Sequence, residues 1–94
     1  MNKLNLMSDK LGGIVLIDFP KKGWCHLVAD TIPFLHEFAE EIGLQRHWFE
    51  NKRGKKRPHY DVKGEMIIKA IENGAFQVSS KEIVIFLKEH YENT

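Results

Sequence analysis

The sequence has one cysteine, Cys25, and no apolar run long enough to cross a membrane. Small secreted domains usually contain several paired cysteines, so a single one favours a reducing, cytoplasmic location. A membrane-spanning helix needs roughly 20 apolar residues. The first ten residues include Asp9 and lack the apolar core of a signal peptide. We therefore expect a cytoplasmic protein with no membrane partner.

The chain also has little net charge, +1 over 94 residues. This value excludes a strong attraction of the whole molecule to nucleic acid. The charge is uneven, however, because five of the basic residues lie within positions 52–57. A chain of this length forms one domain with a thin core, so a homo-oligomer or a bound ligand would add stability.

Apolar spacing and turn residues predict the elements of the first half. Residues 14–17 form a short β-branched run typical of a buried strand, and residues 25–29 are a second extended segment. A helix follows, capped by Asp30 or Thr31, with Pro33 in its first turn. The apolar stripe of this helix ends at Ile42, and Gly43 is expected to end the helix.

The second half continues the alternation. We expect a short strand at 44–49, a loop at 51–58, and a helix from the N-cap Asp61 to Asn73 with Met66, Ile67, Ala70 and Ile71 buried. A strand at 76–78 precedes a helix that Ser79 and Glu82 begin as a capping box. The prediction is a single α/β domain at 14–94, with three to four short strands and three helices, after an extension at 1–13.

The candidate binding residues cluster in three segments and the basic loop. If the strands are parallel, ligands bind at their carboxyl ends, in the loops after Ile17, Phe49 and Val78. The predicted start of the second helix, beside the basic loop, also suits an anion. The predicted ligand-binding residues are Trp24, His26, Asp30, Arg46, His47, Trp48, Lys55, Arg57, His59, Tyr60 and Asp61.

Metal binding and cysteine chemistry are weaker interpretations. His26, His36, His47 and His59, with Asp30 and Asp61, provide donor atoms, but no HExxH or CxxC spacing supports a site. Ordinary histidines at element edges explain the same residues, so the sequence assigns no metal ligand and no cofactor. No base is placed beside Cys25 by any sequence signature.

Several motifs resemble a family of small bacterial and phage proteins of unknown function, DUF4031. The resemblance covers about residues 14–88 and implies no activity. Members often have Gln at the position of Glu50, and a basic pair at the position of Met66–Ile67. If the basic pair of the other members contacts a ligand, the basic residues of the 52–57 loop would make those contacts in this chain. The matching segments are Trp24–Asp30, Leu35–Ala39, Ile42–Leu44, Arg46–Phe49, Pro58–Asp61, Gly74–Ala75 and Val78–Glu82.

Three functions remain open at this point. The first is binding of a phosphate-containing, nucleotide-type small ligand, because Trp, His and Tyr side chains flank a basic loop. The second is a metal-dependent phosphoesterase that uses the His and Asp residues. The third is a nucleic-acid or protein partner module; five charges in one loop are a small footprint for a duplex.

Overall fold

The computed structural model describes residues 13–52, 54 and 56–92, and these form a five-stranded mixed sheet with helices on both faces. The strand order is β3-β4-β2-β1-β5. All neighbouring strands are antiparallel except β1 and β5, which are parallel. The elements are β1 (Val15–Ile17), β2 (Trp24–Ala29), α2 (Ile32–Glu41), the 3-10 helix η1 (Arg46–Trp48), β3 (Phe49–Lys52), β4 (Arg57–Lys63), α3 (Glu65–Glu72), β5 (Phe76–Gln77), α4 (Ser80–Leu87) and the π-helical turn η2 (Lys88–Glu92).

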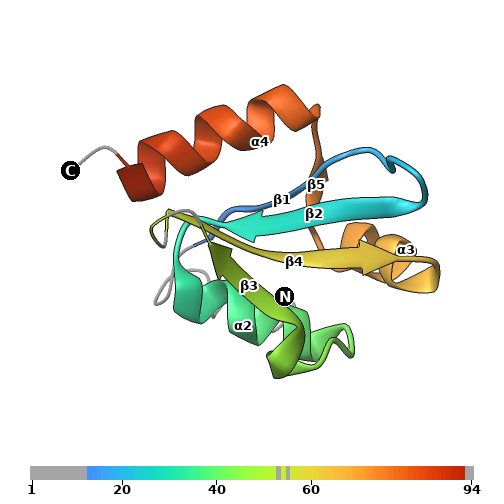
Figure 1. The fold of residues 1–94 in the computed structure, drawn as a ribbon. Helices are drawn as coiled ribbons and strands as arrows, with labels where there is room; N and C mark the ends of the chain where they lie inside the picture. Colours follow the sequence, from blue (N-terminus) through green and yellow to red (C-terminus); the bar gives the residue numbers. More distant parts are fainter. Residues whose placement is uncertain (1–12, 53, 55, 93–94) are drawn as a thin grey trace.

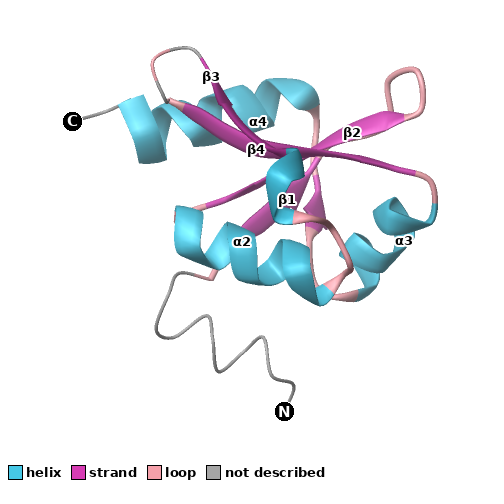
Figure 2. Cartoon of the chain, turned by 60° about the horizontal axis from the view of Figure 1, so that its bottom comes forward, coloured by secondary structure: helices cyan, strands magenta, loops and turns pink. Residues whose placement is uncertain are grey.

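The two faces of the sheet are covered differently. α2 and α3 lie on one face, and α4 lies across the other (Figures 1 and 2). Strand alternation explains this division, because successive side chains point to opposite faces. Leu27 and Tyr60 belong to the main core with α2, whereas Val28 packs on the other face with Ile83 and Leu87 of α4.

Local capping explains where the helices begin and end. The Thr31 hydroxyl accepts the Phe34 amide at 3.2 Å and caps α2, so of the two predicted caps Thr31 is correct. Asp30 instead accepts the backbone N–H groups of Gly13 and Ile14. The predicted capping box of α4 is confirmed, with both the Ser79 and the Glu82 bonds formed. The α/β class and the number of α-helices, three among the described residues, agree with the prediction.

Other predictions for the second half were wrong in detail. The sheet has five strands rather than three to four, because the expected 51–58 loop contains the end of β3 and the start of β4. Asp61 is not a helix cap; it lies inside β4, and α3 starts at Glu65 after Gly64. Ile71 is exposed instead of buried.

The expected strand at 44–49 was also wrong, because η1 occupies Arg46–Trp48 and β3 begins only at Phe49. The predicted extension at 1–13 lies outside the described residues except for Gly13. Within the described part of the chain, no helix has the length and apolar character needed to span a membrane.

Candidate functional site

The outward face of β4 carries a row of polar side chains. Pro58, Tyr60 and Val62 are buried in the direction of α2 and α3. The residues between them point to the α4 side, because side chains alternate along a strand. This second row consists of Arg57, His59, Asp61 and Lys63.

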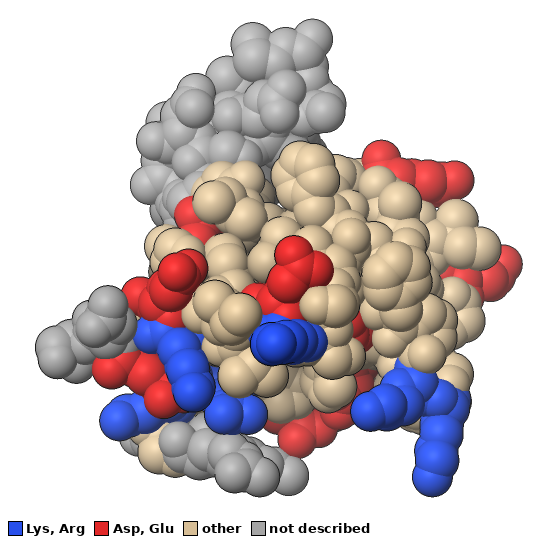
Figure 3. Space-filling view, turned by 90° about the horizontal axis from the view of Figure 1, so that it is seen from above, with Lys and Arg blue, Asp and Glu red and all other residues tan. Residues whose placement is uncertain are grey.

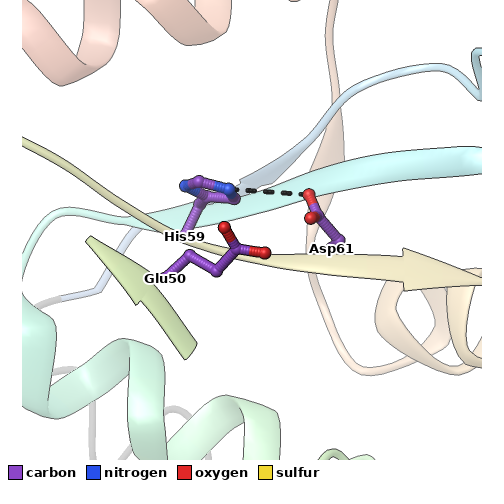
Figure 4. Close-up of side chains that lie close together, drawn as sticks. All are labelled: Glu50, His59 and Asp61. Atoms are coloured by element: carbon purple, nitrogen blue, oxygen red, sulfur yellow. Dashed lines mark ion pairs between the residues drawn. The ribbon is translucent and has the colours of Figure 1, made fainter. Parts of the chain in front are cut away.

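Strand register brings residues from three strands together on this face. Across the β2–β4 ladder His26 lies opposite Asp61, and across the β3–β4 ladder Glu50 lies opposite His59. His59 Nε2 is 3.5 Å from Asp61 Oδ1, and His26 Nε2 is 4.0 Å from the same oxygen. Figure 4 shows Glu50, His59 and Asp61 turned toward one another. Four residues that the sequence separates by as many as 35 positions therefore meet at one place.

A buried carboxylate fixes the orientation of the His26 ring. Asp18 is 1% exposed and follows β1 directly. Its carboxylate accepts the His26 backbone N–H at 2.7 Å, the His26 Nδ1–H at 2.8 Å and the Ser80 hydroxyl at 3.0 Å. An ionised carboxylate only accepts hydrogen bonds, so the ring proton lies on Nδ1. In a neutral ring the lone pair is then on Nε2, which is the atom nearest Asp61.

A backbone carbonyl fixes the His59 ring in the same way. Its Nδ1 donates to the carbonyl oxygen of Arg57 at 2.8 Å. A carbonyl oxygen accepts only, so the neutral His59 ring also has its lone pair on Nε2. Both rings therefore direct an acceptor nitrogen toward the Asp61 carboxylate. An arrangement of three acceptors is complete only when a proton or a cation lies between them.

The donor set suits a transition-metal ion. Imidazole with carboxylate is a frequent ligand combination for zinc, iron and manganese. Two ligands about 2.1 Å from one ion at a tetrahedral angle lie roughly 3.4 Å apart, close to the 3.5 Å between His59 and Asp61. Ligand atoms of Glu50, His59 and Asp61 all lie within 4.8 Å of one another. Histidine ligands usually donate their second ring N–H to a carboxylate or a carbonyl, as His26 and His59 do.

A hollow of about 250 Å³ adjoins this cluster, between α4 and the sheet. We call it the α4 hollow. Its apolar wall comes from Val28 and α4, and its polar wall includes Ser80 and the Arg57 guanidinium. Arg57 is loosely paired, since its Nε lies 3.8 Å from the Glu92 carboxylate. A bound anion can therefore recruit Arg57 without breaking a tight ion pair.

Several predicted site residues lie elsewhere. Tyr60 is fully buried on the opposite face, where its hydroxyl meets His36 Nδ1 at 2.8 Å. Asp30 follows the far end of β2 from Trp24. In η1, Arg46 bonds the Glu40 carboxylate at 2.9 Å. The structure thus joins His26, His59, Asp61 and Arg57, and separates them from Asp30, Tyr60 and Arg46.

The rest of the predicted set divides in the same manner. Trp24 and Trp48 are partly exposed and line a second hollow beside Asp61. His47 is exposed in η1 and contacts the Trp48 ring edge-on. Lys55 lies outside the described residues. The predicted anion site at a helix start was misplaced, because His59 and Asp61 lie within a strand.

The described basic residues do not form a continuous surface. On the face seen from the α4 side, Lys and Arg side chains stand in separate groups with acidic residues among them (Figure 3). Strong duplex binders spread basic charge over a whole face. This distribution gives no support to a nucleic-acid interface on the described part of that face.

Cys25 has the properties of a core residue. It is fully buried in the main core, on the side of the sheet away from the cluster. Burial, with a contribution from the Asp18 charge, raises the pKa of its thiol to about 11. A catalytic cysteine needs a lowered pKa and access to substrate, so Cys25 is not a nucleophile here.

Asp18, Ser80 and Glu50 were not among the predicted site residues. Asp18 lies in the predicted loop after Ile17, and Ser80 is the first residue of α4, just beyond the predicted loop after Val78. The two places meet because β1 and β5 are parallel. The alternation of Pro58, Tyr60 and Val62 with polar residues was the available signal that β4 is a strand with a polar face. Proline is uncommon inside strands and aspartate is typical of helix N-caps, so Pro58 and Asp61 pointed instead to a loop and a helix start.

The described residues form a small mixed α/β fold with a histidine–carboxylate cluster on the sheet face that carries α4. The family model described as "Protein of unknown function (DUF4031)" matches residues 15–90, and the chain belongs to this family. No curated protein and no solved structure matches the chain.

Proposed function

We propose that this protein binds a divalent transition-metal ion through Glu50, His59 and Asp61, with His26 beside them, and uses the ion to bind a phosphate-containing small ligand. One observation supports this proposal above the others. Hydrogen bonds at Nδ1 hold both histidine rings so that both Nε2 atoms face the same oxygen of Asp61. Ligand atoms of Glu50, His59 and Asp61 lie within 4.8 Å of one another, and His26 Nε2 lies 4.0 Å from Asp61 Oδ1.

The charges around the cluster explain why the ligand would need the metal. A phosphate on this face would meet the carboxylates of Asp18, Glu50 and Asp61, with Arg57 as the cation in the hollow. A divalent ion is the largest local charge in such a site and reverses this balance. Three protein ligands also leave coordination positions open for phosphate oxygens. Arg57 would then pair with the oxygens that face the α4 hollow.

Metal binding is tested directly by calorimetry of the chelator-treated chain with Zn²⁺, Mn²⁺ and Co²⁺. We expect one ion per chain, and for Co²⁺ the absorption of a site with nitrogen and oxygen ligands. His59→Ala and Asp61→Asn should lower the affinity by more than the roughly 10- to 100-fold typical of second-shell variants. His47→Ala, an exposed histidine outside the cluster, is the matched control and should bind normally.

Phosphate binding is tested with phenyl phosphate in the presence of Mn²⁺. Heat of binding should appear with the metal, disappear with EDTA, and weaken in Arg57→Gln without loss of the metal. A folded protein that binds none of the three ions contradicts the proposal. A protein that binds Mn²⁺ but never phenyl phosphate retains the metal site and refutes the phosphate ligand.

A second candidate function is hydrolysis of the bound phosphate ester. It is favoured by the three-ligand set, because an open position can hold a water molecule whose pKa the ion lowers. Release of p-nitrophenol from bis(p-nitrophenyl) phosphate by the Mn²⁺-loaded chain would support it, provided that Asp61→Asn removes the activity. Equal turnover by wild type and Asp61→Asn would assign the activity to a contaminant or to free metal.

A further inference from the structure

A second hollow, of about 500 Å³, lies at the edge of β4. We call it the β4-edge hollow. It exists because β3 pairs with β4 only as far as Tyr60, so that Asp61–Lys63 have β2 as a neighbour on one side alone. Leu44 and Met66 form its apolar floor, and Trp24 and Trp48 line it. The volume is within the range of ordinary small-molecule sites.

Both tryptophans of the chain line this hollow, and each leaves nearly half of its surface exposed. Isolated exposed aromatics are common on proteins, but two partly exposed indoles on one concave surface present flat apolar area to a ligand. Lys63 holds its ammonium 4.8 Å from the centre of the Trp24 ring. This cation–π contact covers one face of the Trp24 indole and orients the ring, so that a base would stack on its other face with the Lys63 ammonium nearby as a hydrogen-bond donor.

The β4-edge hollow is continuous with the proposed metal site. Asp61 and Glu50 line the hollow and also belong to the histidine–carboxylate cluster. Asp61 and Lys63 point to the same side of β4 and are about 7 Å apart along the strand. A ligand that spans both places would put a flat ring beside the tryptophans and a phosphate at the metal, with a sugar-sized linker between them.

We propose that the β4-edge hollow is the nucleobase subsite of the metal site, so that the phosphate-containing ligand is a nucleotide. This inference rests on the proposed function for its phosphate half. The part of the inference that concerns the nucleobase rests independently on the two tryptophans and Lys63. Base–aromatic stacking tolerates any base, because every base has a π-face. The carboxylates and Lys63 offer acceptors and a donor to base edges.

The test is calorimetry of the Mn²⁺-loaded chain with the four ribonucleoside 5′-monophosphates and with ribose 5-phosphate. At least one nucleotide should bind about 5- to 150-fold more tightly than the sugar phosphate, the range expected from stacking of one base. Trp24→Ala should remove this preference and leave the affinities for ribose 5-phosphate and Mn²⁺ unchanged. Trp24→Phe keeps a ring and should retain most of it, and Trp48→Ala serves if Trp24→Ala does not fold.

The two proposals fail in different ways. Equal affinity for ribose 5-phosphate and all four nucleotides overturns the nucleobase subsite but leaves the metal site intact. If the chain binds no Mn²⁺, the proposed function fails, and the subsite is judged by adenosine and guanosine without metal. Since both tryptophans line the hollow, nucleoside binding would quench the intrinsic fluorescence. Unchanged fluorescence would overturn the subsite as well.

Discussion

Replacing Asp18 by alanine should weaken both the fold and the metal site. Its carboxylate is almost fully buried and accepts three hydrogen bonds, from the His26 amide, the His26 ring and the Ser80 hydroxyl. Those bonds connect the end of β1, the centre of β2 and the start of α4. No other described side chain accepts from all three of these groups.

The expected loss of stability follows from what each donor can do without the carboxylate. The His26 ring is half exposed, and water can replace its partner at a loss of about 1 kcal/mol. The Ser80 hydroxyl is at the surface and should lose a similar amount. The backbone amide of His26, in the sheet beneath α4, loses a short bond to an anion, which adds roughly 1–2 kcal/mol. The sum, about 3–4 kcal/mol, is a large part of the 5–14 kcal/mol expected for a chain of this size.

Urea unfolding of Asp18→Ala, Asp18→Asn and Asp30→Ala measures this loss. Asp30 is the matched control, because its carboxylate also accepts backbone amides but lies outside the cluster. We expect Asp18→Asn to lose less stability than Asp18→Ala, and to lower metal affinity by about 10- to 100-fold through misorientation of His26. Asp30→Ala should keep normal metal affinity. If Asp18→Ala loses less than about 1 kcal/mol, water replaces the carboxylate and the reasoning is wrong.

Three other predictions concern groups away from the cluster. The buried Cys25 thiol, whose pKa burial raises to about 11, should resist thiol-disulfide reagents at pH 8 in the native chain and react in urea. Burial, then the nearby Arg46 charge, lowers the pKa of His36. The unfolded chain therefore binds the extra proton more readily, and stability should fall as the pH drops below about 6.5, the ordinary value. His36→Gln should reduce this fall, measured by urea unfolding at pH 7.5 and 5, whereas the exposed His47→Gln should leave it nearly unchanged. Ser79→Ala should cost about 1 kcal/mol in thermal unfolding, because it removes the cap of α4.

Features of the fold that depend on neighbouring residues were predictable from the sequence. The α2 stripe that includes Leu35 and Phe38 is buried as its spacing predicts. Gly43 follows α2 with a φ of +96°, a conformation that glycine adopts without strain. The Ser79 capping box needs only four consecutive residues. These signals are local, and the structure agrees with them.

Strand register is not local, and the site depends on it. His26 meets Asp61 only because β2 and β4 pair in one register, and a shift by one residue would turn every side chain of β4 to the other face. The sequence identified His26, His59 and Asp61 as candidates by residue type. It could not separate them from His36 and His47, because the difference lies in which strands become neighbours.

The anchoring of the two histidines is the strongest reason to assign the cluster a role beyond stability. His59 Nε2 and Asp61 Oδ1 gain nothing from facing each other while the ring is neutral, since both are acceptors. Hydrogen bonds at Nδ1 hold the two rings in place: the Asp18 carboxylate accepts from His26, and the Arg57 carbonyl oxygen accepts from His59. Fixing two rings in this way loses side-chain freedom before any ligand arrives. Binding sites generally show this preorganisation, and a proton or a metal ion between the three acceptors turns their mutual repulsion into attraction.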